Sequence, residues 1–96
     1  MIKHIVCFKL KDKTDELVAE TKKILLSMRE NVPTVKDIEV GIDFLDSPRS
    51  YDVFLAVTLD SREALDIYQN DTYHVDVVKK HMHAHTESSV AIDFDI

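Results

Sequence analysis

The central stretch of the chain reads Asp37-Ile38-Glu39-Val40-Gly41-Ile42-Asp43-Phe44, residues 37–44. Its even-numbered positions are apolar and its odd-numbered positions are acidic or glycine, the period-two alternation of a strand with one buried face. A second segment rich in β-forming residues follows at 51–59, after a turn around Ser47-Pro48. These two segments predict a β-hairpin in the middle of the chain.

A helical region is predicted on each side of this hairpin. Before it, apolar residues in 14–32 recur every three to four positions, and Pro33 follows directly. After it, a capping-type start near 60–63 opens a short helix, which 70–72 interrupts before helicity resumes over 74–86. Each region is expected to pack one apolar stripe against the sheet.

The two ends of the chain also alternate, at 2–10 and 89–96. The order β-α-β-β-α-β predicts an α+β ferredoxin-like fold with a four-stranded antiparallel sheet. Both helical regions are expected on one face of the sheet, because right-handed crossovers place them on the same side. A chain of 96 residues is the size of one domain, so a single domain over 1–96 is predicted.

One face of the predicted sheet stays half apolar after the helices are placed. It carries these side chains among lysines and acids: Ile5, Cys7, Phe54, Ala56 and Ala91. Such a patch is unfavourable in water. Because two-fold homodimers are the commonest closed assembly, we expect a second copy to cover this face. The alternative is a monomer with scattered small apolar residues in solvent.

The composition of the chain argues against several classes of binding partner. The chain has 18 acidic and 12 basic residues, and the basic ones are scattered, which disfavours nucleic-acid binding. With Gly41 as the only glycine, no phosphate-binding loop and no nucleotide cofactor are expected. Residues 1–6 lack a charged segment that leads into a signal-type apolar stretch. We therefore expect no membrane association and a cytoplasmic location.

Three segments together point to a family. The first is 2–10, in which Lys3-His4 is followed by alternating apolar residues. The second is Tyr68-Gln69-Asn70-Asp71-Thr72-Tyr73-His74-Val75, residues 68–75, and the third is the closing strand at 90–94. In this order they resemble the stress-responsive A/B barrel family, often called Dabb, a branch of the dimeric α+β barrel proteins.

The resemblance implies that two sheets pack face to face and that each monomer keeps a cavity between its sheet and its helices. One plant branch is similar to aromatic polyketide cyclases, in which the residues matching Tyr68 and His74 form an acid-base pair. Other members are known mainly through stress induction. Where the family often has histidine-proline, this chain has Asp71-Thr72, so any role of that first histidine is absent. Fold likeness alone does not transfer the chemistry.

Three side chains are candidates for one site: His4, Tyr68 and His74. His4 is the odd polar residue on the apolar face of 2–10, where an imidazole needs a hydrogen-bond partner. Tyr68 falls on the helical stripe that faces the sheet, and His74 begins the next helical segment. A histidine exchanges protons near neutral pH, and a tyrosine hydroxyl can hold a carbonyl or enolate oxygen. The structural alternative is a buried histidine, a core tyrosine and a histidine at a helix start.

Other candidate groups are assigned structural roles. His81 and His85 lie one helical turn apart, a spacing for two metal ligands, with His83 between them. No third ligand is evident and histidines complement a helix C-terminus, so no metal site is predicted. Cys7 is expected to be a small hydrophobe on the dimer face. The following carboxylates are expected on a solvated rim: Asp37, Glu39, Asp43, Asp52, Asp93 and Asp95.

The residues thus favour two functions, and a third is a weaker alternative. The first is a cofactor-free enzyme that enolises or cyclises a small carbonyl-containing molecule, with His74 as base and Tyr68 as oxyanion partner. The second is a stress-associated or ligand-binding homodimer without turnover. The third is a heme-free monooxygenase like those of related barrels. A cavity in which His4, Tyr68 and His74 converge would favour the first.

Overall fold

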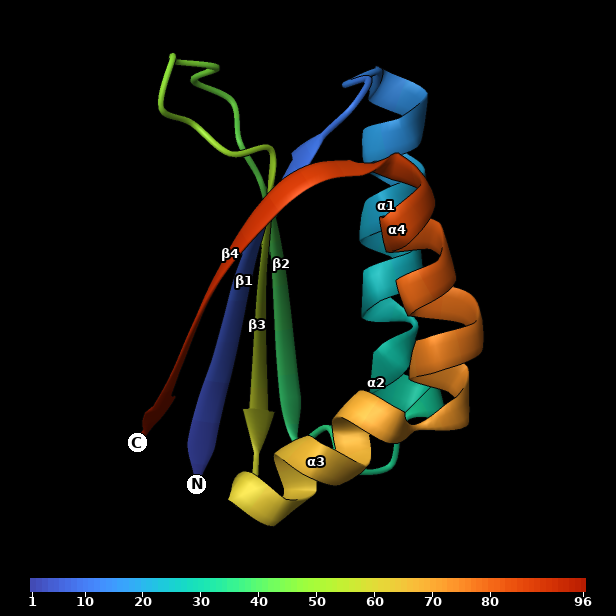
Figure 1. The fold of residues 1–96 in the computed structure, drawn as a ribbon, viewed down its shortest axis with the longest axis vertical. Helices are drawn as coiled ribbons and strands as arrows, with labels where there is room; N and C mark the ends of the chain where they lie inside the picture. The colour runs from blue at the N-terminus through green and yellow to red at the C-terminus, as the bar shows by residue number, and fades with distance from the viewer.

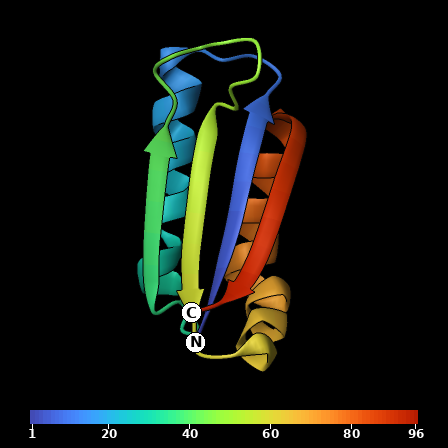
Figure 2. The same cartoon turned by 90° about the vertical axis from the view of Figure 1, so that its left-hand side faces the viewer.

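The fold is a four-stranded antiparallel sheet with helices on one face only, as the computed structural model of residues 1–96 shows (Figures 1 and 2). The elements in chain order are β1 (Ile2–Leu10), α1 (Asp15–Leu26), α2 (Met28–Asn31), β2 (Asp37–Ile42), β3 (Val53–Leu59), α3 (Arg62–Asn70), the π-helical segment η1 (His74–Lys79), α4 (Lys80–His85) and β4 (Thr86–Asp95). The strand order is β2-β3-β1-β4. The predicted ferredoxin-like α+β fold is therefore confirmed.

Short polar side chains start the helical regions where the sequence placed them. Thr14 Oγ1 accepts a hydrogen bond from the Leu17 amide at 3.1 Å, and Ser61 Oγ accepts one from the Ala64 amide at 3.1 Å. The interruption predicted at 70–72 is present but shorter, because only Asp71 leaves the helical conformation and helicity resumes at residue 72. These caps fix the residues at which α1 and α3 begin.

The strand ends differ from the prediction by two to three residues. β2 ends at Ile42 instead of continuing to Phe44, because Asp43 Oδ2 accepts the Asp46 amide at 2.7 Å and bends the chain. Asp46 has a φ of 55°, the left-handed conformation that aspartate tolerates. Phe44 consequently lies in the β2–β3 loop with 95% of its surface exposed. β4 starts at Thr86, three residues earlier than predicted.

The register of β4 against β1 corrects one face assignment. Ile92 lies opposite Ile5, and Ala91 lies opposite Val6. Residues directly opposite each other in an antiparallel pair point to the same face of the sheet. The prediction that Ala91 shares a face with Ile5 was wrong, and it is the large apolar residues of β4 that do so. A shift of one residue in a strand exchanges its two faces.

We call the outer patch the apolar residues on the sheet face opposite the helices: Ile5, Cys7, Phe54, Ala56, Val90, Ile92 and Phe94. Figure 2 looks onto this face, with the helices behind it. Val90 is 50% exposed, Ile92 60% and Phe94 40%. The uncovered face is therefore more apolar than the sequence pattern predicted.

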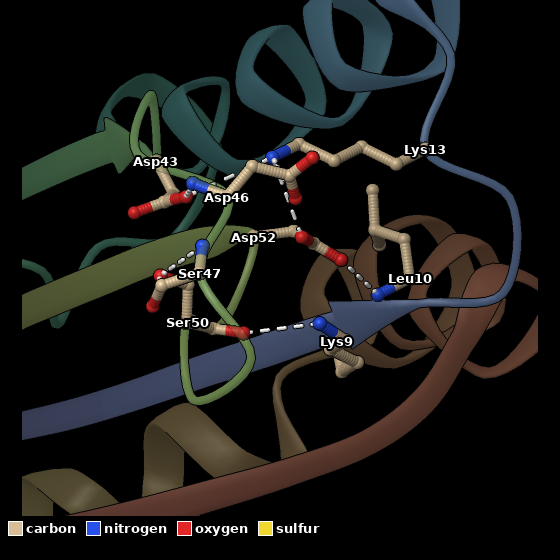
Figure 3. Close-up of polar contacts among 8 residues, drawn as sticks. All are labelled: Lys9, Leu10, Lys13, Asp43, Asp46, Ser47, Ser50 and Asp52. Carbon is tan, nitrogen blue, oxygen red and sulfur yellow. Dashed lines mark hydrogen bonds and ion pairs between the residues drawn. The ribbon is translucent and has the colours of Figure 1, made fainter.

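Asp52 also departs from the prediction, because it is 3% exposed and does not belong to a solvated rim. Its Oδ2 accepts the Leu10 amide at 2.8 Å, and its Oδ1 lies 3.4 Å from Lys13 Nζ (Figure 3). Lys13 also lies within 3.9 Å of Asp43 and 3.7 Å of Asp46. One lysine thus ties the β2–β3 loop to the segment after β1.

The core fills the space between the sheet and the helices. Its fully buried side chains come from both layers, such as Leu25 and Met28 from the helices and Val57 and Leu59 from β3. No helix is long and apolar enough to cross a membrane. The buried set also contains Tyr68, which brings the fold to the candidate site.

Candidate functional site

A cavity of about 290 Å³ lies between the helices and the sheet, and His4, Tyr68 and His74 all line it. β1 supplies His4, α3 supplies Tyr68, and η1 begins at His74. Most of the remaining wall is apolar: Val6, Phe8, Leu25, Leu55, Val78 and Met82. The structure thus brings together the three side chains that the sequence singled out. An apolar cavity with a few convergent polar groups is typical of a small-molecule site.

His74 is held with one ring nitrogen free. Its Nδ1 bonds to the backbone carbonyl of Tyr68 at 2.8 Å, and because a carbonyl only accepts, Nδ1 carries the proton. Asp71 Oδ1 accepts the His74 amide at 3.1 Å and positions the start of η1. Burial lowers the pKa of His74 below its ordinary value, and the charge of Lys79 acts in the same direction. His74 is therefore neutral at physiological pH with Nε2 available as a base.

Tyr68 is fully buried and packs against both histidines. Its ring centroid lies 4.2 Å from that of His74 and 5.8 Å from that of His4. The hydroxyl donates to Met28 Sδ at 3.7 Å, and a thioether is a weak acceptor. Burial raises the pKa of Tyr68 far above that of a free phenol, so the hydroxyl keeps its proton at neutral pH. It therefore remains a hydrogen-bond donor.

His4 has a carboxylate partner that the sequence reasoning missed. Its Nδ1 bonds to Asp93 Oδ1, which fixes the proton on Nδ1 and leaves Nε2 free. Asp93 is solvent-exposed, as expected of a rim carboxylate, with 43% of its side chain accessible, but β4 places it directly opposite His4. The two terminal strands pair with each other. If the opposite face of β4 had been assigned to the helix side, Asp93 would have been predicted beside His4.

The sequence reasoning also missed three polar residues of the cavity wall, Lys79, His83 and Thr86. Lys79 and His83 lie four residues apart in η1 and α4, and Thr86 is the first residue of β4. The spacing was present in the sequence. It gave no separate signal, because a lysine and a histidine on a helix are ordinary surface residues.

His81 and His85 lie outside this cavity. Their ring centroids are 4.7 Å apart, and His81 Nε2 bonds to the hydroxyl of the buried Thr21 at 2.8 Å. Burial lowers the pKa of His81, and the neighbouring charge of His85 adds to this effect. The contact between His81 and Thr21 joins α4 to α1. No group of three potential metal ligands is present around them.

A larger hollow of about 440 Å³ lies on the other side of the sheet, beside the β2–β3 loop. Cys7, Tyr51 and Phe54 are among the residues that line it. It contains no histidine, and its two carboxylates, Asp43 and Asp52, are both paired with Lys13. Since it borders the outer patch, it belongs to the uncovered surface, and the smaller cavity is the better candidate for chemistry.

Comparison with known protein families identifies the family of this chain. The sequence model of the Stress responsive A/B Barrel Domain, Dabb, matches residues 2–96. The chain belongs to the Dabb family. No curated protein matches this Dabb chain in sequence.

Solved structures share the fold of this Dabb chain at low sequence identity. A dimeric ferredoxin-like protein of unknown function from Thermobifida fusca is 23% identical, with a TM-score of 0.85 over 99% of this chain and 90% of that one. An Arabidopsis thaliana protein is 20% identical, with a TM-score of 0.85 over 100% and 95%. A hydroxynitrile lyase from Passiflora edulis is 14% identical, with a TM-score of 0.83 over 99% and 92%. At these identities the likeness establishes the fold alone.

Proposed function

We propose that this chain is a cofactor-free enzyme that performs acid-base chemistry, enolisation or ring closure, on a small carbonyl-containing molecule. The observation that carries the proposal is the cavity in which two histidines, each with Nδ1 engaged and Nε2 free, both pack against Tyr68. Such tautomers suit proton transfer, because one nitrogen is oriented while the other exchanges the proton.

In the proposed step, His74 Nε2 removes a proton from the carbon next to the carbonyl. The electron pair of that C–H bond forms the C=C bond of the enolate, and the π pair of the carbonyl moves onto its oxygen, where negative charge develops. The Tyr68 hydroxyl, which leaves its weak bond to Met28 Sδ, donates to this oxygen. The proton on His74 Nε2 then returns to the enolate carbon or, in ring closure, to the new alkoxide, while His4, with its proton held on Nδ1 against Asp93, offers Nε2 as the acceptor of any second proton. Burial of the cavity strengthens each of these interactions.

Proton exchange with solvent tests this proposal without knowledge of the natural substrate. Acetophenone and 2-heptanone are incubated with the protein in buffered D₂O, and the loss of their α-proton signals is followed by NMR. We expect exchange above the buffer rate, reduced about 10²- to 10⁴-fold by His74→Gln. The matched control is His85→Gln, which alters a histidine outside the cavity. Equal exchange by wild type and His74→Gln would remove His74 from the mechanism.

The alternative is a small-ligand-binding protein without turnover. This alternative is supported by the hydrogen bonds that the site residues already make within the protein. The Tyr68 hydroxyl, His74 Nδ1 and His4 Nδ1 each have one. A thermal-shift measurement with the same ligands and variants, beside the exchange experiment, separates the two functions. Ligands that raise the melting temperature of wild type and of His74→Gln equally, with no exchange at their α-carbons, would support binding alone.

We also propose that two copies associate through the outer patch. Val90, Ile92 and Phe94 expose large apolar surfaces on one sheet face, which is costly in water unless a second surface covers it. Two structural neighbours, from Thermobifida fusca and Bacteroides fragilis, are described as dimeric. In such a dimer the cavity stays on the helix side of each sheet, away from the contact.

A further inference from the structure

Two consecutive carbonyl groups at the end of α3 hold two side chains of η1. The carbonyl of Tyr68 accepts a hydrogen bond from His74 Nδ1 at 2.8 Å. The carbonyl of Gln69 accepts one from Lys79 Nζ, also at 2.8 Å. The last carbonyls of a helix lack partners within the helix and carry partial negative charge, so N–H donors and cations bind them favourably. The imidazole and the ammonium are therefore anchored to neighbouring groups of the same helix end.

The π-helical form of η1 explains how both side chains reach this helix end. His74 is the first residue of η1 and Lys79 is the last. In an α-helix, residues five apart lie about 140° apart around the axis. The hydrogen bonds of a π-helix join residues five apart, which brings His74 and Lys79 toward one side of the segment. Both residues consequently line the same cavity.

Lys79 is the one permanently charged residue in the wall of the cavity. No carboxylate neutralises its ammonium, because none of the ion pairs of the structure involves it. Burial lowers the pKa of His74, and the positive charge of Lys79 acts in the same direction. A charge acts more strongly on a buried imidazole than on one in bulk water, because the effective dielectric constant is lower.

The other titratable groups around His74 oppose the ammonium or carry no permanent positive charge. Burial is the largest influence on the pKa of His74, and the bond to the Tyr68 carbonyl and the charge of Asp71 both raise this pKa. His4 on β1 lowers it when protonated, and His83 on α4 is an exposed residue of the wall. α1, β3 and β4 contribute only uncharged side chains to the wall. The ammonium is therefore the one permanent charge that favours the neutral imidazole.

We propose that Lys79 is a positioning residue for His74: its ammonium binds the helix end that holds the imidazole, and its charge keeps the imidazole neutral, with Nε2 free to act as a base. This rests on the proposed function, in that it concerns the regulation of the same base. The site thereby stays active at lower pH than a histidine without this neighbour would allow. Lys79 transfers no proton in this role, so its replacement should shift the pH range of activity.

The pH dependence of ketone α-proton exchange tests the inference, together with an NMR titration of the His74 ring signals. His74→Gln identifies these signals by their loss. Lys79→Gln lacks the charge and retains an N–H donor for the Gln69 carbonyl. We expect it to move the midpoint of both curves to higher pH, with an exchange rate on the alkaline plateau close to that of wild type. Lys79→Met is a second neutral variant and should shift both midpoints in the same direction.

Two further variants serve as controls. Lys79→Arg keeps the charge and should keep the wild-type midpoint. Lys80→Gln is the matched control, because it removes the same charge from the exposed neighbour, which does not line the cavity. It should also titrate like wild type.

Three results would overturn the inference: equal His74 midpoints in wild type and both neutral Lys79 variants, an equal shift in Lys80→Gln, or a lower plateau rate with an unmoved midpoint, which indicates a structural role alone. The NMR titration needs no substrate and so separates this inference from the proposed enzyme. A raised midpoint in Lys79→Gln, with absent ketone exchange in wild type, would reject the chemistry and retain the effect of Lys79 on His74. Ketone exchange that depends on His74, with equal midpoints, would do the reverse.

Discussion

The substitution Ile92→Asp tests the contact of the proposed homodimer. Ile92 is 60% exposed in the single chain, and complete burial of an isoleucine side chain stabilises by about 1.5 to 3 kcal/mol. Burying the exposed part in both copies is therefore worth about 2 to 3.5 kcal/mol per dimer. Its loss weakens dimerisation by about 30- to 300-fold, since 1.4 kcal/mol corresponds to a factor of ten. Two aspartates in an apolar contact add a further cost.

The neighbouring substitution Ala91→Asp is the matched control. It introduces the same charge one residue away, on the face that belongs to the cavity. Sedimentation equilibrium should give wild type and Ala91→Asp the same dimer dissociation constant, and Ile92→Asp a much larger one. Circular dichroism checks that both variants stay folded, as expected for exposed positions. The reasoning would be refuted if Ile92→Asp dimerised like wild type, or if Ala91→Asp dissociated in its place.

Three further predictions concern individual polar side chains. Asp52→Ala leaves the Leu10 amide unpaired, so the free energy of unfolding should fall by about 1 to 3 kcal/mol. Thermal scans should show Tm lowered by roughly 5 to 20 °C. An unchanged Tm would contradict the role of this bond. The pKa values of His74 and His81 are lowered in the folded state, so the unfolded chain binds more protons. The free energy of unfolding should therefore fall as pH drops below about 6.5. A variant with both His74→Asn and His81→Asn that loses stability with acid as wild type does would refute this. Asp93→Asn should slow ketone exchange about tenfold or more while Tm stays nearly constant, and exchange at the wild-type rate would exclude the carboxylate from the mechanism.

The sequence determined those features that depend on local periodicity and capping. Alternation at 2–10 and 37–44 established strands, and the apolar stripe of 14–32 established a helix, because each pattern is complete within one segment. The order of these segments was enough for the ferredoxin-like fold. The interruption at 70–72 and the buried position of Tyr68 followed from the same local reasoning.

Tertiary pairing decided what local patterns leave open. The alternation in β4 is equally compatible with either face, and only its register with β1 assigns Ile92 to the outer patch and Asp93 to the partner of His4. Asp52 is buried because it reaches the Leu10 amide, 42 residues away in sequence. The cavity likewise joins side chains from β1, α3, η1 and β4, which no single segment can indicate. The physical reason is that alternation specifies two faces of a strand, whereas hydrogen bonding to a distant strand selects which of them meets the helices.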